Sequence, residues 1–233
     1  MIVGLYIAVV LIGYLLGSIP FGVIIGRSFA KTDIRQVGSG KIGMTNVLRT
    51  AGKKAAALAL LLDMGKGAAP VFLASVIFHT GKAVEAGSLT WVEGAEALAA
   101  LAAISGHSWS IFLKFKGGRG VSTFIGGLFA MFWPAAVVGG GLMLVIGFRT
   151  KYMSMGSIIG AVTAFIMLMA FNVLRLAFLR PSPPIEYVIY AMVCAIFIYV
   201  MHRDNIIRLV SGTERKIGDK VKAEVSPSSS HPK

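Results

Sequence analysis

The sequence predicts an all-α polytopic integral membrane protein with seven transmembrane helices, its N-terminus outside and its C-terminus cytoplasmic. Hydrophobic residues make up 56% of the 233 residues and charged residues only 14%, with a mean hydropathy of +0.78. A soluble domain carries about a quarter charged residues. The apolar residues form long runs, and the basic residues gather in short loops between them, as the positive-inside rule predicts for cytoplasmic loops.

An apolar run needs roughly 20 residues to cross the hydrocarbon layer. The expected spans are residues 2–26, 55–78, 95–113, 153–174 and 185–201. A further run, residues 121–148, contains Trp133-Pro134 and then three consecutive glycines. Hydropathy alone is compatible with one kinked span or with a hairpin of two short helices at this run.

The distribution of charge favours the hairpin. The loop at 149–154 and the segment from Arg203 onward are both basic. One crossing by residues 121–148 would place both outside, whereas two crossings return them to the cytoplasm together with the basic loop 27–54. The fourth and fifth of the seven helices are then short, with ~13 residues and a length of about 20 Å.

We expect one membrane domain over residues 1–216 and a polar, disordered tail over residues 217–233. The first apolar run lacks a basic start and a small-residue cleavage site, so we expect a retained span and not a signal peptide. Cys194 is the one cysteine, which excludes a disulfide framework and a thiolate metal site. The positions of the basic residues argue against a nucleic-acid partner.

The segment "VGSGKIGMTNVLR", residues 37–49, looks like half of a phosphate-binding loop. A nucleotide-binding P-loop requires Ser or Thr after the Gly-Lys pair and an earlier glycine, but Ile42 and Arg35 occupy those positions. Glycine N–H groups can still form an anion-binding concavity, and Arg49 can clamp a phosphate. The alternative is a flexible loop whose basic residues serve only topology.

Three further polar clusters share the cytoplasmic face in this topology. "KFKGGRGVST", residues 114–123, is a second basic glycine loop at a helix start, where free N–H groups bind anions. Ser154 begins the sixth span, and His202 stands one helical turn from Asn205 after the last. Within the membrane, Asp63 and Lys66 at i and i+3 predict a buried ion pair.

Together, "YLLGSIPFG", "GSGKIGMTNVLR", "LLDMGKG", "GHSWSIFLKFKGGRGVST" and "HRDNIIRL" closely resemble the bacterial acyl-phosphate:glycerol-3-phosphate acyltransferase family, over residues 12–216. The resemblance implies a seven-span enzyme of the bacterial inner membrane whose active site faces the cytoplasm. It implies transfer of a fatty acyl group from acyl phosphate to the 1-hydroxyl of sn-glycerol 3-phosphate, giving lysophosphatidic acid and inorganic phosphate in phospholipid biosynthesis.

The resemblance, together with the two basic glycine loops that contribute Gly38, Lys41 and Arg119, gives a set of expected site residues. The expected catalytic residues are Ser39, Arg49, Lys116, His202 and Asn205. The expected substrate-binding residues are Gly38, Gly40, Lys41, Thr45, Asn46, Gly117, Gly118, Arg119, Gly120 and Ser154. This chain departs from the usual family residues at Lys41 (commonly Asn), Met44 (Ala), Ser110 (Pro) and Arg119 (Lys).

An acyl phosphate is a mixed anhydride with a good leaving group, so the enzyme needs no nucleophile of its own. We expect direct attack by the glycerol hydroxyl, with Arg49 and Lys116 neutralising phosphate and Ser39 assisting at the oxyanion. His202 acts as a general base, or a substrate phosphate oxygen takes the proton instead. Asn205 orients the substrate.

No metal or cofactor is expected, and the H-x-x-x-x-D pattern of other glycerolipid acyltransferases is absent from the sequence. The expected partners are acyl phosphate, glycerol 3-phosphate and membrane lipid; contact with the enzyme that supplies acyl phosphate stays open. A carrier or channel for phosphorylated metabolites is the rival function, and a non-catalytic scaffold is a third. The polar clusters lie at one face and not at the bilayer midplane, which favours an enzyme over a carrier.

Overall fold

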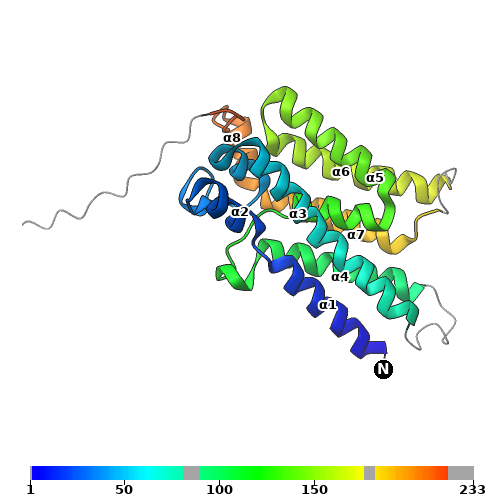
Figure 1. Ribbon diagram of the computed structural model, residues 1–233. Helices are drawn as coiled ribbons and strands as arrows, with labels where there is room; N and C mark the ends of the chain where they lie inside the picture. The colour runs from blue at the N-terminus through cyan, green and yellow to red at the C-terminus, as the bar shows by residue number, and fades with distance from the viewer. Residues whose placement is uncertain (1, 81–89, 176–181, 220–233) are drawn as a thin grey trace, which may run out of the picture.

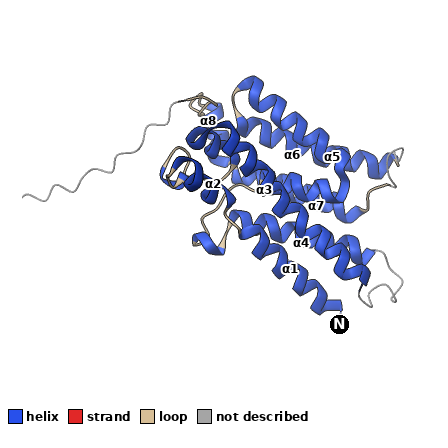
Figure 2. Cartoon of the chain, in the orientation of Figure 1, coloured by secondary structure: helices blue, strands red, loops and turns tan. Residues whose placement is uncertain are grey.

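The computed structural model describes residues 2–80, 90–175 and 182–219, which fold into a bundle of helices (Figures 1 and 2). In chain order the elements are α1 (Ile2–Ser18), α2 (Phe21–Ala30), η1 (Ile34–Gln36), α3 (Met44–Thr80), α4 (Thr90–Ser108), η3 (Ile111–Leu113), α5 (Val121–Thr150), α6 (Met153–Leu174), α7 (Ile185–Met201) and α8 (Arg203–Val210). Figure 1 shows the short helices α2 and α8 together at one end of the bundle.

The first apolar run is divided into two helices at Pro20. The expected span 2–26 lies within a stretch, Ile2–Ala30, that is long and apolar enough to cross a membrane, but its helix is interrupted, because α1 ends at Ser18 and α2 begins at Phe21. Proline lacks an N–H and disfavours helical geometry at the preceding residue. The short α2 buries Val23 and Ile25. Because the helix is interrupted at Pro20, α2 can run in a different direction from α1.

Helix α3 contains the expected span 55–78 but begins earlier. A bend at Gly52, which has a φ of +84°, separates residues 44–51 from the long apolar part of the helix. Residues with a side chain rarely adopt such a φ, so glycine permits the bend. Because of the bend, the segment that carries Thr45, Asn46 and Arg49 runs in a different direction from the rest of α3.

The run at residues 121–148 folds back on itself within α5. Phe132 has non-helical backbone angles (φ −151°, ψ 84°), and Pro134 follows it. A Cβ atom added at Gly140 would lie 3.2 Å from Ile125, although 15 residues of straight helix would span about 22 Å. The segments on the two sides of Phe132 therefore pack side by side, as expected for a hairpin of two short helices.

The all-α, multi-span architecture is confirmed. Among the described residues, five helical stretches are long and apolar enough to cross a membrane, with α1 and α2 counted together as Ile2–Ala30, or six if the bent pair α7 and α8 forms one span. The expected spans 153–174 and 185–201 coincide with α6 and α7. Large side chains such as Leu61, Phe72 and Val173 are more than 60% exposed on the outside of the bundle, where a membrane protein meets lipid. The count of seven spans and the orientation stay predictions.

A buried polar joint fixes the helix ends around the site. Lys66 pairs with Asp63 at 2.8 Å and also donates to the carbonyl oxygen of Ile19 at 2.8 Å, within the break between α1 and α2. Ser110 donates to the carbonyl oxygen of Ser18 at 2.6 Å. In hydrocarbon, backbone groups outside helices need such protein partners, so the joint stabilises the break at Pro20.

We expect Lys66→Met to destabilise the folded protein by about 3–5 kcal/mol, because it leaves the Asp63 carboxylate buried without its ammonium partner. Lys54→Met, at an exposed position of the same helix, is the matched control. Thermal unfolding in detergent measures both. Equal melting temperatures for the two variants would contradict a stabilising role for the pair.

Candidate active site

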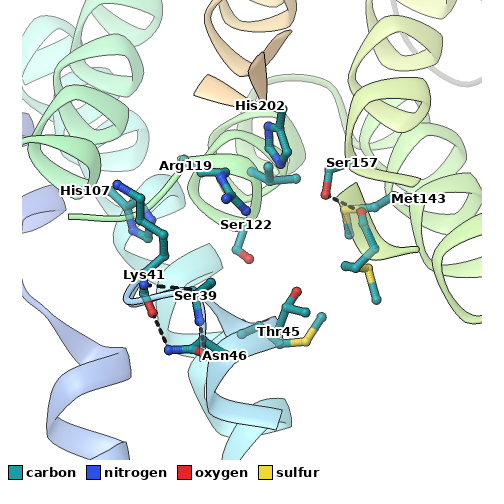
Figure 3. Close-up of a pocket in the computed structure, with 15 residues that line it drawn as sticks. Ser39, Lys41, Thr45, Asn46, His107, Arg119, Ser122, Met143, Ser157 and His202 are labelled. Atoms are coloured by element: carbon teal, nitrogen blue, oxygen red, sulfur yellow. Dashed lines mark hydrogen bonds between the residues drawn. The ribbon is translucent and has the colours of Figure 1, made fainter. Parts of the chain in front are cut away.

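Two adjoining hollows form one polar cavity at the end of the bundle where the loops gather. The inner hollow has a volume of about 70 Å³ and the outer hollow one of about 220 Å³. Both are lined by Ser39, Lys41, Thr45, Arg119, Met153, Ser157 and His202. Figure 3 shows the side chains of Lys41, Arg119 and His202 around the inner hollow. The cavity thus joins residues from the two glycine loops, α6 and the end of α7.

Asn46 holds the first glycine loop in shape. This side chain is 2% exposed; its Nδ2 donates to the carbonyl oxygens of Ile34 (2.7 Å) and Lys41 (2.9 Å), and its Oδ1 accepts from the Ser39 N–H at 3.2 Å. One amide therefore fixes the backbone on both sides of Gly40. A loop-holding role accounts for its polar atoms, and the substrate contact that we expected from it stays a prediction.

The second glycine loop is packed against His107. The N–H groups of Gly117 and Gly118 donate to the carbonyl oxygens of Ser108 and His107, both at 3.0 Å. We expected such N–H groups to be free for an anion, and at these two positions they are not. A Cβ atom at Gly118 would overlap the His107 ring, so close packing explains this glycine. The packed loop leads to Arg119, which lines both hollows.

His202 contributes a neutral imidazole to the cavity. Its Nδ1 lies 2.8 Å from the carbonyl oxygen of Ile198; a carbonyl only accepts, so Nδ1 carries the proton and Nε2 is an acceptor. Burial, followed by the positive charge of Arg119, lowers the pKa of His202 to about 4. The imidazole is therefore uncharged at neutral pH and a weak proton acceptor.

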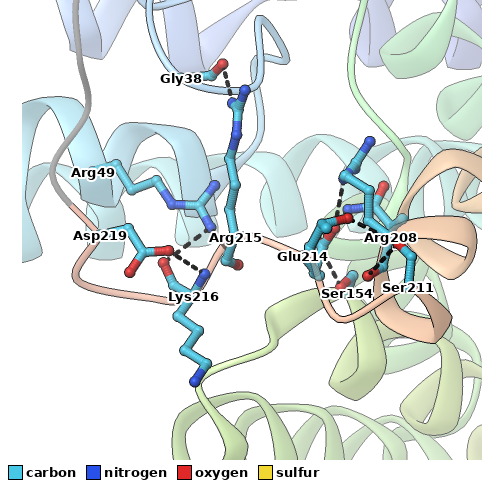
Figure 4. A network of polar contacts seen from close by, with 11 residues as sticks. Gly38, Arg49, Ser154, Arg208, Ser211, Glu214, Arg215, Lys216 and Asp219 are labelled. Atoms are coloured by element: carbon cyan, nitrogen blue, oxygen red, sulfur yellow. Dashed lines mark hydrogen bonds and ion pairs between the residues drawn. The ribbon is translucent and has the colours of Figure 1, made fainter.

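A C-terminal strap, residues 211–219, lines the outer hollow through Glu214 and Arg215, and Figure 4 shows their polar contacts. Arg49 donates to the carbonyl oxygen of Arg215 at 3.1 Å, and Arg215 in turn donates to the carbonyl oxygen of Gly38. The N–H of Ile217 donates to the carbonyl oxygen of Lys151 at 2.8 Å, between α5 and α6. Residues 217–219 of the expected disordered tail therefore belong to the folded part, while residues 220–233 lie outside the described residues.

The cavity is strongly cationic. Its lining includes the basic side chains of Lys41, Arg49, Arg119, Arg208 and Arg215 and the acidic side chains of Asp204 and Glu214. Arginine guanidinium groups match phosphate geometry because they donate two parallel hydrogen bonds. The geometry therefore suits a phosphorylated ligand. Among the described residues, no cluster of three or more His, Cys, Asp or Glu side chains is placed to hold a metal.

An apolar groove meets this cavity at Arg49. The groove has a volume of about 840 Å³ and lies between α3 and the second half of α5. Its apolar lining is formed by Met44, Leu48, Ala56, Ala57, Leu60, Leu144, Phe148 and Ile217, and Arg49 lines both the groove and the outer hollow. A ligand with a charged head and a long apolar chain would fit across the junction.

Comparisons with known proteins agree with this arrangement. The family model described as "Glycerol-3-phosphate acyltransferase" matches residues 7–212. The chain belongs to the glycerol-3-phosphate acyltransferase family. It is 42% identical over 222 residues to glycerol-3-phosphate acyltransferase 3 of Dehalococcoides mccartyi strain CBDB1, covering 95% of this chain and all of that protein. It is 44% identical over 214 residues to the Zymomonas mobilis glycerol-3-phosphate acyltransferase, covering 89% and 93%.

Two solved structures have the same fold. Crystal structures of PlsY (YgiH), an integral membrane glycerol 3-phosphate acyltransferase, superpose on 91% of this chain. The glycerol 3-phosphate form gives a TM-score of 0.75 at 33% identity and 96% coverage of that chain, and the lysophosphatidic acid form gives 0.73 at 32% and 94%. The predicted family, the acyltransferase activity and the multi-pass membrane character are confirmed.

The structure brings most of the predicted site residues together. Those that line the polar cavity are Gly38, Ser39, Lys41, Thr45, Asn46, Arg49, Arg119, Gly120, Ser154, His202 and Asn205. Gly40, Lys116, Gly117 and Gly118 do not line it, and the Lys116 side chain is exposed. The sequence interpretation missed Ser122, Glu214 and Arg215. An acid within the basic segment "GTERK" was the one signal for Glu214.

We expect Asn46→Asp to lower kcat/KM at least a hundredfold. A carboxylate cannot donate to the carbonyl oxygens of Ile34 and Lys41, and unpaired buried groups cost about 1–3 kcal/mol each. Asn172→Asp, a part-buried amide that donates to Pro183 in another region, is the isosteric control. Acyl transfer and proteolytic nicking of residues 35–43 report the effect. An Asn46→Asp protein with normal transfer and an intact loop would contradict this role.

Proposed function

We propose that this protein transfers a fatty acyl group from acyl phosphate to the 1-hydroxyl of sn-glycerol 3-phosphate, yielding lysophosphatidic acid and inorganic phosphate. The observation that carries the proposal is the junction at Arg49, where a cationic cavity meets an apolar groove. Both substrates carry phosphate, and the donor also carries a long chain. The family and its relatives supply the acceptor, glycerol 3-phosphate; the sequence motifs supply the donor.

The two substrates bind in different parts of the site. The acyl chain lies in the apolar groove, which buries it from water, and its phosphate reaches the cavity beside Arg49. Glycerol 3-phosphate occupies the cavity, where Lys41 and Arg119 neutralise its phosphate. The carbonyl carbon then lies near the junction, so positioning of the two reactants supplies most of the rate enhancement.

The reaction proceeds by direct attack. The glycerol oxygen bonds to the carbonyl carbon, the bond from that carbon to the bridging phosphate oxygen breaks, and inorganic phosphate leaves. Cationic side chains and Ser39 stabilise the charge that develops on oxygen. With a pKa of about 4, His202 is a weak base at neutral pH, so a phosphate oxygen of a substrate receives the hydroxyl proton. His202 then positions ligands through its Nε2.

We also propose seven spans, an outside N-terminus and a cavity that faces the cytoplasm of a bacterial inner membrane. The basic loop 27–54, loop 114–120, the 149–152 turn and the strap all meet at the cavity end of the bundle, which supports this orientation through the positive-inside rule. The fold-back at Phe132 supports two short spans within α5. The exposed apolar side chains make contact with membrane lipid.

Reconstituted protein given acyl phosphate and glycerol 3-phosphate should release phosphate and lysophosphatidic acid in equal amounts. Because Arg119 lines both hollows and Lys116 is exposed outside them, Arg119→Ala should lose at least a hundredfold in kcat/KM, and Lys116→Ala less than tenfold. Lys116→Ala is thereby the matched control from the same loop.

Two outcomes would contradict these assignments. Phosphate release without lysophosphatidic acid would end the acyl-transfer proposal. If both proteins fold and Lys116→Ala loses more kcat/KM than Arg119→Ala, the catalytic cation of this loop is Lys116 and not Arg119.

A further inference from the structure

Glu214 is a carboxylate inside a cavity otherwise dominated by cations. It accepts three hydrogen bonds: from Ser154 Oγ at 2.9 Å and Asn205 Nδ2 at 2.6 Å on its Oε1, and from Arg208 Nε at 2.8 Å on its Oε2. The three donors come from α6 and α8, while Glu214 belongs to the strap; Figure 4 shows Ser154 and Arg208 beside Glu214. These bonds determine which polar atoms Ser154 and Asn205 can offer to a ligand.

An ionised carboxylate only accepts hydrogen bonds. Asn205 must therefore turn its NH₂ group toward Glu214, which places Oδ1 at the other end of the amide. Asn205 is 5% exposed, and its buried Oδ1 has no hydrogen-bond partner among the described residues. Ser154 likewise directs its hydroxyl proton to Glu214, so toward any other group its Oγ can only accept. Both side chains line the outer hollow as acceptors.

Glu214 keeps this role at neutral pH. Burial raises its pKa, but hydrogen bonds from Asn205, Ser154 and Arg208 outweigh burial, and the pKa is lowered below its usual value. The carboxylate is then ionised above its ordinary titration range and has no proton to donate. The amide of Asn205 is therefore held in one orientation.

The cavity thus offers two kinds of hydrogen-bonding group. Lys41, Arg49 and Arg119 carry only donors, which a phosphate requires. Asn205 Oδ1 and Ser154 Oγ are acceptors, which repel a second anion and which a hydroxyl group requires. Figure 4 shows the side chain of Arg215 between Arg49 on one side and the cluster of Glu214, Ser154 and Arg208 on the other. One ligand that carries a phosphate and neighbouring hydroxyl groups can bind both the donors and the acceptors of the cavity.

We infer that Glu214 is a positioning residue that makes Asn205 and Ser154 hydrogen-bond acceptors for the hydroxyl groups of the acyl acceptor, so that the cavity selects a polyol monophosphate. This inference rests on the proposed function, in which glycerol 3-phosphate is the acceptor. The hydroxyl that does not react, at C2, gains a binding partner, while the reacting hydroxyl at C1 is oriented. A ligand with phosphate alone or with two phosphates would leave these acceptors unpaired.

The test compares two acyl acceptors. Glycerol 3-phosphate has the C2 hydroxyl and 3-hydroxypropyl phosphate lacks it; both have a terminal hydroxyl to acylate. The measured quantity is the ratio of kcat/KM for the first to kcat/KM for the second. In the wild-type protein the ratio should exceed about ten, because a site built to bind a hydroxyl rejects the analogue that lacks it. In Glu214→Gln, whose NH₂ group can face Asn205 and reverse its amide, the ratio should fall about tenfold.

Glu186→Gln makes the same chemical change at the start of α7, remote from the cavity, and should keep the wild-type ratio. Ser154→Ala removes one acceptor and one of the three hydrogen bonds to Glu214 but keeps the carboxylate and its bond from Asn205. Its ratio should also fall, and it tests the inference if Glu214→Gln does not fold. A wild-type ratio in folded Glu214→Gln, or in Ser154→Ala in its place, would overturn the inference. No transfer to either acceptor by the wild-type protein would instead refute the proposed function.

Discussion

Buried polar side chains hold the irregular backbone around the cavity, and the rest of the site depends on them. Asn46 fixes the first glycine loop, His107 supports the second, and Lys66 with Asp63 secures the break after α1. Outside water, every exposed N–H and carbonyl group needs a protein partner. These anchors satisfy that requirement, so non-helical chain carrying several cations can remain ordered at the edge of a membrane.

A rigid cationic cavity is sufficient for this chemistry. An acyl phosphate is already activated, so the enzyme has to bring two anions together and neutralise them, and it needs no nucleophile or strong base. Arg49 lines both the polar cavity and the apolar groove, so in the proposed binding mode the reacting carbonyl lies at the junction of the two. Binding of head and chain thereby fixes the reaction geometry.

The sequence was sufficient to predict the multi-span helical fold, the fold-back within α5 and the convergence of the polar clusters, because hydropathy and charge are local signals. It could not predict contacts between distant residues. Three contacts arise from tertiary structure: the close packing of Gly118 on His107, the position of Arg119 and not Lys116 in the cavity lining, and the bond from Ser154 to Glu214, 60 residues apart. The sequence thus predicted that the polar loops come together, while the contacts of their individual members came from the structure, and their catalytic roles stay predictions.

Direct transfer between two bound substrates is the central claim. Isotope exchange tests it: the reconstituted protein is incubated with unlabelled acyl phosphate and radioactive inorganic phosphate, without glycerol 3-phosphate. Direct transfer predicts no label in acyl phosphate, because no acyl-enzyme is formed from which phosphate could attack. Label that enters acyl phosphate without an acceptor, at a rate comparable to turnover, would show an acyl-enzyme intermediate and contradict the account.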